Sequence, residues 1–261
     1  MLASESTLRL DKMPLLIGKA VAVIGGSRGV GRRIVEVARH NGARVLAVAR
    51  QAAPLRQLAQ EVSGTEVLSF DATEEGAPSK VFDVLQPDIL ILCAGAFPPT
   101  APLQALSWQQ FSANWDADVK IAFHFCKAAL LRPLPAGASV VLMSSGAAVA
   151  GSPNSGGYAG AKRMQVFIAN YCQKESDRLG LGLRFMAVAP RIVPDTELGR
   201  HIVAGYARYL GMSAADLIQS MESPPTSSNV AAAVIELVTN AVRCKGKAFV
   251  LSGKHLEVMP P

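Results

Sequence analysis

The chain has 261 residues and a formal net charge of +6; 50% of its residues are hydrophobic and 18% are charged, which excludes a disordered chain and allows one buried core. It contains no run of about 18 uncharged apolar residues, so we expect neither a transmembrane helix nor a membrane partner. The four cysteines are far apart and lack CxxC spacing, which predicts reduced thiols in a cytoplasmic protein and no metal site.

Short, continuous apolar segments recur along the chain and are typical of strands buried on both faces of a sheet. They lie at residues 20–24, 44–49, 66–70, 88–93, 139–143, 183–189 and 247–251. Helical patterns separate them, at residues 29–41, 53–62, 77–85, 105–130, 157–179 and 228–242. Because this alternation implies parallel strands joined by right-handed crossovers, the sequence predicts an α/β fold. We expect a single Rossmann-type, doubly wound, seven-stranded parallel sheet with helices on both faces.

Two segments fall outside this alternation. Residues 1–17 carry charges before any sustained apolar run, so they do not resemble a secretory signal. We expect them to form an N-terminal arm ahead of a single domain over 18–261. Residues 191–226 contain prolines and short amphipathic pieces. Because ligands bind beyond the carboxyl ends of parallel strands, this segment is a candidate lid, with ordinary helical decoration as the alternative.

The first predicted strand runs directly into a glycine-rich turn. Its sequence is Ile24-Gly25-Gly26-Ser27-Arg28-Gly29-Val30-Gly31, and a helix follows at once. Gly25 permits the sharp turn, Gly29 lets backbone amides approach a pyrophosphate, and Gly31 allows the helix to pack closely on the strand. The first amides of that helix and its dipole favour an anion. The turn therefore predicts a dinucleotide site; a glycine-rich turn without a ligand is the alternative.

Two arginines indicate which dinucleotide binds. In an NAD site an acid usually follows the second strand and binds the ribose 2′-hydroxyl, but residues 47–51 contain none. Arg50 at that position and Arg28 in the turn would instead attract a 2′-phosphate, and Ser27 would add a hydroxyl donor. Basic residues also outnumber acidic ones over residues 1–60, which suits a phosphorylated ligand or a nucleic acid. We therefore predict NADP(H), with merely exposed arginines as the alternative.

The helix after the fifth predicted strand carries Tyr158 and Lys162, which share one face because they are four residues apart. Ser145 follows that strand, and the small residues between allow its hydroxyl to face the Tyr158 phenol. Hydride transfer between a nicotinamide and a carbonyl carbon also moves a proton on the oxygen. The Lys162 ammonium would lower the pKa of Tyr158 from about 10 and make it a better acid/base catalyst. Ser145 would donate a hydrogen bond to the substrate oxygen.

On these motifs the chain resembles the short-chain dehydrogenase/reductase family over residues 18–253, as a divergent member. The TGxxxGxG motif of that family has Ile24 here in place of its threonine, and NNAG appears as Leu92-Cys93-Ala94-Gly95. The family's Pro-Gly after the sixth strand appears as Pro190-Arg191. The resemblance implies that Ser145, Tyr158 and Lys162 are catalytic. The cofactor site that the motifs and the resemblance predict comprises Gly25, Ser27, Arg28, Gly29, Val30, Arg50, Asp71, Ala72, Cys93, Ala94, Gly95, Tyr158, Lys162, Pro190, Ile192, Val193 and Thr196.

A fourth catalytic position of the family, an asparagine in the long fourth helix, corresponds here to Asp118. Asn114 is nearby but lies one turn too early. In the family this asparagine helps to hold a water in the proton relay from the lysine. Asp118 would serve through its backbone carbonyl, and its carboxylate would change the charge around Lys162.

The residues and the resemblance together predict an NADP(H)-dependent oxidoreductase that interconverts a carbonyl and an alcohol in a small molecule, working as a reductase. The resemblance also implies a homo-oligomer, a dimer or tetramer, built through residues 105–130 and 157–179; the alternative is that the apolar faces of these segments belong to the core. The main alternative is a catalytically weak or inactive NADP-binding sensor or scaffold, which the altered asparagine motifs favour. A methyltransferase on a similar sheet would explain the glycines but not the Ser-Tyr-Lys set. We expect no nucleic-acid partner, because no aromatic-rich surface motif accompanies the basic residues.

Overall fold

The computed structural model describes residues 15–240, 244–253 and 255–260. Eight strands form one sheet in the order β3-β2-β1-β4-β5-β6-β7-β8. The first seven run parallel to their neighbours, and β8 runs antiparallel to β7. The strands are β1 (Ala20–Ile24), β2 (Arg44–Ala49), β3 (Thr65–Ser69), β4 (Ile89–Leu92), β5 (Ser139–Met143), β6 (Arg184–Pro190), β7 (Ala248–Ser252) and β8 (His255–Val258). The predicted doubly wound parallel sheet is therefore confirmed, with one additional antiparallel strand at its edge.

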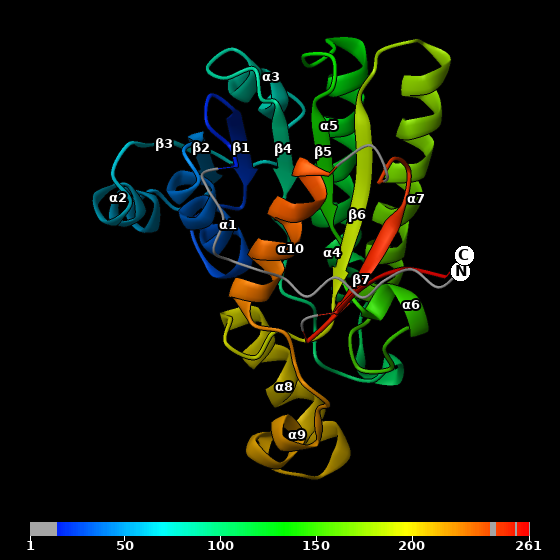
Figure 1. Ribbon diagram of the computed structural model, residues 1–261. Helices are drawn as coiled ribbons and strands as arrows, with labels where there is room; N and C mark the ends of the chain where they lie inside the picture. The colour runs from blue at the N-terminus through cyan, green and yellow to red at the C-terminus, as the bar shows by residue number, and fades with distance from the viewer. Residues whose placement is uncertain (1–14, 241–243, 254, 261) are drawn as a thin grey trace, which may run out of the picture.

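Helices cover both faces of the sheet (Figure 1). They are α1 (Gly29–His40), α2 (Ala52–Glu61), α3 (Ala77–Phe82), α4 (Trp108–Asn114), α5 (Lys120–Leu131), α6 (Ala147–Ala150), α7 (Tyr158–Arg178), α8 (Glu197–Leu210), α9 (Ala214–Ser220) and α10 (Ser227–Thr239). A short 3₁₀ turn, η1, spans Leu103–Ala105, and a π-helical turn, η2, spans Trp115–Val119. Among the described residues, no helix combines the length and apolarity needed to cross a membrane.

The core consists of one apolar layer on each face of the sheet. Along β1, Val21 and Val23 face the layer formed with α1, α2 and α10, whereas Ala22 and Ile24 face the layer formed with α3, α5 and α7. Successive side chains of a strand point to opposite faces, so a strand buried on both sides must be apolar throughout. This is why the strands appear in the sequence as continuous apolar runs.

The predicted helix over 105–130 is wrong as one element, because it is divided into α4, η2 and α5. Ser107 and Gln110 form a capping box that starts α4 at residue 108. The π turn that follows contains the buried Asp118. Turns of this kind inside α-helices are often found at functional sites.

β8 is absent from the predicted elements because its four residues form no apolar run. Only Leu256 among them is partly buried, and the strand lies at the sheet edge. Most of the predicted arm lies outside the described residues. Of its last residues, Leu16 is buried and packs in the core.

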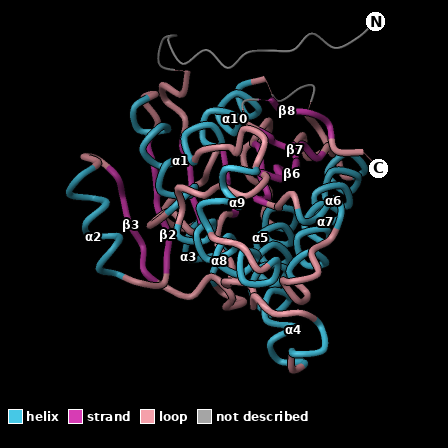
Figure 2. The backbone as a smooth tube through the Cα atoms, turned by 90° about the horizontal axis from the view of Figure 1, so that it is seen from below, coloured by secondary structure: helices cyan, strands magenta, loops and turns pink. Residues whose placement is uncertain are grey.

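The strand order reverses between β1 and β4: the chain passes outward through β2 and β3 and returns to β4 on the other side of β1. α8 and α9, which belong to the predicted lid segment, lie beyond the carboxyl ends of the strands in Figure 1. Figure 2, seen from below, shows these two helices in front of the strand ends. A crevice at such a switch point is the usual ligand site of an open parallel sheet.

Candidate active site

A cleft of about 250 Å³ lies at this switch point. Its floor is the glycine turn after β1, and its walls come from the ends of β2, β3 and β4, the start of α7 and the start of α8. Most of the predicted cofactor residues line it, together with Asp118. These are Gly25, Ser27, Arg28, Gly29, Val30, Arg50, Asp71, Ala72, Cys93, Ala94, Gly95, Tyr158, Lys162 and Thr196. Pro190, Ile192, Val193 and Ser145 are not among its lining residues.

The glycine turn is shaped by close backbone approaches that leave no room for side chains. Gly25 has φ 92°, and a Cβ atom there would lie 2.5 Å from the amide nitrogen of Ala94. A Cβ atom on Gly31 would collide with the carbonyl oxygen of Gly25. The backbone before α1 is extended at Arg28, whose side chain does not cap the helix. The first amides of α1 therefore face the cleft without a side-chain cap and can bind an anion, as a dinucleotide site requires.

Tyr158 and Lys162 lie in the first turn and a half of α7. Both side chains are buried, and the Lys162 Nζ atom lies 5.5 Å from the centroid of the Tyr158 ring. That nitrogen donates to the carbonyl oxygen of Met143 at 2.9 Å and to Gln165 Oε1 at 3.2 Å. The Ser144 hydroxyl donates to the Lys162 carbonyl oxygen at 2.8 Å. The end of β5 thus holds the ammonium beside the phenol.

Asp118 forms an ion pair with Lys162, with 3.4 Å between Oδ2 and Nζ. Its carboxylate also accepts hydrogen bonds from the Ala96 amide at 2.8 Å and from Asn114 Nδ2 at 3.3 Å. A Cβ atom on Gly95 would collide with this carboxylate, which explains why a residue without a side chain stands there. The Asp118 backbone carbonyl, the predicted relay group, accepts a hydrogen bond from Gln165 Nε2 at 3.2 Å. Asp118 therefore reaches Lys162 through its side chain.

Burial raises the pKa of Tyr158 above its ordinary value of 10, because a phenolate in this environment loses its hydration. The Lys162 charge and the Ser145 hydroxyl lower that pKa, whereas the Asp118 charge raises it. We predicted a net lowering by Lys162. The direction of that contribution is as expected, but burial outweighs it.

Burial acts to lower the pKa of Lys162, but the negative charge of Asp118 and the neighbouring Tyr158 phenol outweigh it and raise that pKa. Lys162 is therefore a permanent cation at neutral pH. Burial also raises the pKa of the Cys93 thiol to about 12, so the residue in the NNAG position is a neutral thiol.

The two arginines predicted to bind a 2′-phosphate both line the cleft and both lie near carboxylates. Arg28 Nη1 is 2.9 Å from Glu197 Oε2, and Arg50 Nη1 is 3.9 Å from Asp71 Oδ2. Asp71 also accepts hydrogen bonds from Thr73, whose amide is the main cause of a lowered pKa of Asp71.

Ser145 accepts from the Ala147 amide at 3.2 Å as the chain leaves β5, and its hydroxyl also acts on the Tyr158 phenol, whose pKa it lowers. The other predicted residues have mainly structural contacts. Thr196 caps α8 by accepting from the Gly199 amide, and Val193 packs in the core. Ile192 is partly buried, and Pro190 is the last residue of β6.

Sequence reasoning missed Gln165, which bonds to both Lys162 and Asp118. Its spacing of three residues from Lys162 was a usable signal, because residues three apart share a helix face. It also missed the contact of Glu197 with Arg28. These two residues are 169 positions apart, and no local pattern connects them.

A family model for short chain dehydrogenases matches residues 19–207, which is well over half of the chain. The chain belongs to the short-chain dehydrogenase family. The short chain dehydrogenase/reductase AacuD of Aspergillus aculeatus is 31% identical over 192 residues, which cover 70% of this chain and 67% of that protein. The L-fucose dehydrogenase of Mus musculus is 26% identical over 245 residues, covering 90% of this chain and 88% of its own length.

The (+)-borneol dehydrogenase 2 of Salvia officinalis is 26% identical to this short-chain dehydrogenase over 253 residues, covering 89% of this chain and 87% of the relative. A solved short chain dehydrogenase/reductase family protein superimposes with a TM-score of 0.73 and 21% identity, covering 91% of this chain and 97% of that one. At that identity the likeness shows the fold alone. Within the described ranges, no cluster of three or more His, Cys, Asp or Glu side chains could hold a metal ion.

Proposed function

We propose that this short-chain dehydrogenase is an NADP(H)-dependent oxidoreductase that interconverts a carbonyl and an alcohol in a small molecule, working as a reductase. The observation that carries the proposal is the buried group of Tyr158, Lys162 and Asp118 at the cleft that the glycine turn forms. The relatives support it, since their names describe dehydrogenases and a dehydrogenase/reductase. A cytoplasmic location stays a prediction.

In the reductase direction, the Tyr158 phenol donates its proton to the substrate carbonyl oxygen. Because the pKa of Tyr158 lies above its ordinary value, the phenol is protonated at neutral pH, which is the form that a proton donor needs. Ser145 donates a hydrogen bond to the same oxygen and holds it near the phenol. A nicotinamide cofactor, when bound, supplies or accepts the hydride at the substrate carbon.

Lys162 stabilises the phenolate that proton transfer leaves on Tyr158. Its ammonium is held beside the ring by the Met143 carbonyl and by Asp118, so little reorganisation accompanies the charge change. The same ammonium is the candidate donor to the nicotinamide ribose. Asp118 keeps Lys162 charged, but it also offsets part of the field that Lys162 exerts on the phenol.

The residues of the cleft fit a phosphorylated dinucleotide. The glycine turn allows close approach of a pyrophosphate to the uncapped amides of α1. Arg28 and Arg50 would hold the 2′-phosphate, for which arginine is well suited because it forms parallel hydrogen bonds to phosphate oxygens. Among the described residues, Asp71 is the nearest acid to Arg50. It lies at the end of β3, whereas the acid of an NAD site follows the second strand.

The test is oxidation of NADPH in the presence of a panel of ketones and aldehydes. The Tyr158→Phe variant removes the transferable proton and should lower kcat/KM by about 100-fold or more. NADPH binding should be retained, because the ring stays in place. Tyr171→Phe, on the same helix but outside the cleft, is the matched control and should keep full activity. Unchanged activity of Tyr158→Phe would remove the mechanism.

The ion pair of Lys162 with Asp118 also favours the second candidate, a catalytically weak NADP-binding sensor. A carboxylate 3.4 Å from the ammonium reduces the help that Lys162 gives to the phenolate. The same assay separates the two functions: tight NADPH binding without turnover of any carbonyl in the panel would favour the sensor.

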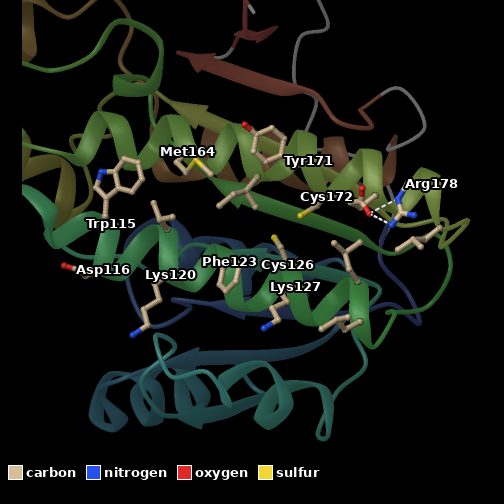
Figure 3. Close-up of a pocket in the computed structure, with 16 residues that line it drawn as sticks. Trp115, Asp116, Lys120, Phe123, Cys126, Lys127, Met164, Tyr171, Cys172 and Arg178 are labelled. Atoms are coloured by element: carbon tan, nitrogen blue, oxygen red, sulfur yellow. Dashed lines mark hydrogen bonds and ion pairs between the residues drawn. The ribbon is translucent and has the colours of Figure 1, made fainter.

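We also propose that the protein is a homo-oligomer assembled through α5 and α7. These helices line an open groove of about 870 Å³, into which side chains of both helices point (Figure 3). Several large apolar side chains on this face are exposed, among them Phe123 at 52%, Tyr171 at 52% and Leu131 at 75%. Exposed apolar surface of this extent is typical of an interaction site.

A further inference from the structure

We propose that Glu197 is a specificity-determining residue that competes with the cofactor 2′-phosphate for Arg28. Through this competition, cofactor choice is linked to the segment 191–226. The inference rests on the proposed function, since it requires that Arg28 meets the 2′-phosphate of NADP(H).

The guanidinium of Arg28 is held on two sides. Its Nη1 atom donates to Glu197 Oε2 at 2.9 Å, and its Cζ atom lies 4.9 Å from the centroid of the Phe97 ring. All three residues line the cleft. The side chains of Arg28 and Glu197 are 52% and 57% exposed, so the pair is open to an anion that enters from solvent.

The position of Glu197 is set by the start of α8, which packs against the glycine turn. Glu197 is the first residue of α8, directly after the capping residue Thr196. A Cβ atom on Gly29 would lie 3.6 Å from the Thr196 Cβ atom, so the cap and the turn are in contact. A carboxylate in the first turn of a helix is stabilised by the helix dipole. The Glu197 carboxylate is therefore stabilised in this position both when it contacts Arg28 and when Arg28 binds a phosphate instead.

A 2′-phosphate that binds Arg28 must break the contact with Glu197, whereas the 2′-hydroxyl of NAD(H) has no such competition. Exposed ion pairs are weak, so we expect the contact to reduce affinity for the 2′-phosphate by roughly two- to fivefold. Arg50 lies 3.9 Å from Asp71, which follows β3 and lies outside the segment, so its contribution does not depend on Glu197.

The segment has a second attachment, at His201, which meets Arg28 only through the Phe97 ring that both side chains contact. A ring nitrogen of His201 lies 2.8 Å from the carbonyl oxygen of Pro98, and the His201 ring packs 5.3 Å from the Phe97 ring. Binding of the phosphate to Arg28 would remove one contact between α8 and the glycine turn, while the contact of Thr196 with Gly29 and this second attachment persist. We expect the loosening to be confined to the residues around Glu197.

The experiment measures binding of adenosine 2′,5′-bisphosphate and adenosine 5′-monophosphate by calorimetry, because these probes differ only in the 2′-phosphate. Glu197→Gln should tighten the bisphosphate by roughly two- to fivefold and leave the monophosphate unchanged. Glu222→Gln, which removes an exposed carboxylate of the same segment, is the matched control and should change neither. Equal affinities of Glu197→Gln and the wild type for the bisphosphate would overturn the inference.

A double-mutant cycle with Arg28→Gln assigns the effect to the pair. In the Arg28→Gln background, the Glu197→Gln change should no longer tighten the bisphosphate. Persistent tightening there would mean a general charge effect and would also overturn the inference. A wild-type protein that does not distinguish the two probes would instead refute the proposed NADP(H) preference, and this inference with it. If the wild type prefers the bisphosphate but Glu197→Gln does not change its affinity, the inference about Glu197 is refuted and the proposed NADP(H) preference stands.

Discussion

Lys162 and Asp118 are both buried, and each has further partners besides the other. The ammonium is hydrogen-bonded to Met143 and Gln165, and the carboxylate accepts from Ala96. Removing one member of a buried pair leaves the other charge uncompensated, which is costly, whereas a fully satisfied pair is tolerated. This single pair connects the loop after β4, the π turn and α7, so it positions Tyr158 as well as tuning its pKa.

The Asp118→Asn variant tests how this pair sets the pH dependence of reduction. In the proposed mechanism the phenol donates the proton, so reductase activity should be lost as the pH rises through the pKa of Tyr158. Asp118 raises that pKa, and its neutralisation should lower it. We therefore expect the alkaline limb of the kcat/KM profile of Asp118→Asn to move to lower pH.

The control for this prediction is Asp116→Asn, which removes an exposed carboxylate two residues earlier. Its profile should match that of the wild type. A limb that moves to higher pH in Asp118→Asn, or does not move, would show that Asp118 does not raise the pKa of Tyr158 in the working enzyme.

At the scale of elements, helix starts determine where the functional side chains lie. α8 begins at a Thr196 cap, α4 at a Ser107 capping box, and α10 at a capping box between Thr226 and Asn229. The π turn between α4 and α5 shifts the helix register and places Asp118 against Gly95. The sequence predicts a single helix over 105–130, without the π turn, because helical periodicity alone does not reveal such a turn.

The Thr226→Ala variant should lower the free energy of unfolding by about 1 kcal/mol, the usual loss for an N-cap hydroxyl. α10 packs its Val230 and Val234 side chains against the sheet but does not line the cleft, so NADPH affinity should be unchanged. Urea denaturation measures the first quantity and fluorescence titration the second. Thr226→Ser, which keeps the accepting oxygen, should be as stable as the wild type; equal loss in both variants would show that the hydroxyl is not responsible.

At the scale of the whole molecule, the sheet separates two apolar layers, and the cleft lies where both meet the strand ends. The outer face of α5 and α7 remains apolar and open (Figure 3). This face is separate from the cleft. However, α7 lines both, because its first residue, Tyr158, lies in the cleft and its later residues line the groove. Assembly through α7 would therefore also hold in place the helix that carries the proposed proton donor.

The Phe123→Glu variant tests this assembly. A charge buried in an apolar interface is unfavourable, so the variant should have a lower mass than the wild type in light scattering at micromolar concentration. Val84→Glu, which places the same charge at an exposed apolar residue away from the groove, should keep the wild-type mass. A monomeric wild type would contradict the proposed oligomer.

The parallel sheet, the glycine turn and the spacing of Tyr158 and Lys162 could be predicted from the sequence, because these signals are local. A strand buried on both faces must be apolar throughout, a sharp turn beside another backbone requires glycine, and residues four apart in a helix share a face. Of the candidate site, the sequence therefore predicted the residues that follow directly after strands or open α7.

The strand order, the edge strand β8 and the partners of the charged groups could not be predicted and are known from the folded chain. The ion pair of Lys162 with Asp118 joins two helices, and the contact of Arg28 with Glu197 joins residues 169 positions apart. Such contacts depend on how separate elements pack, which no short window of sequence contains. The net pKa of Tyr158 was decided in the same way, because burial is a property of the packed molecule and here outweighs the neighbouring ammonium.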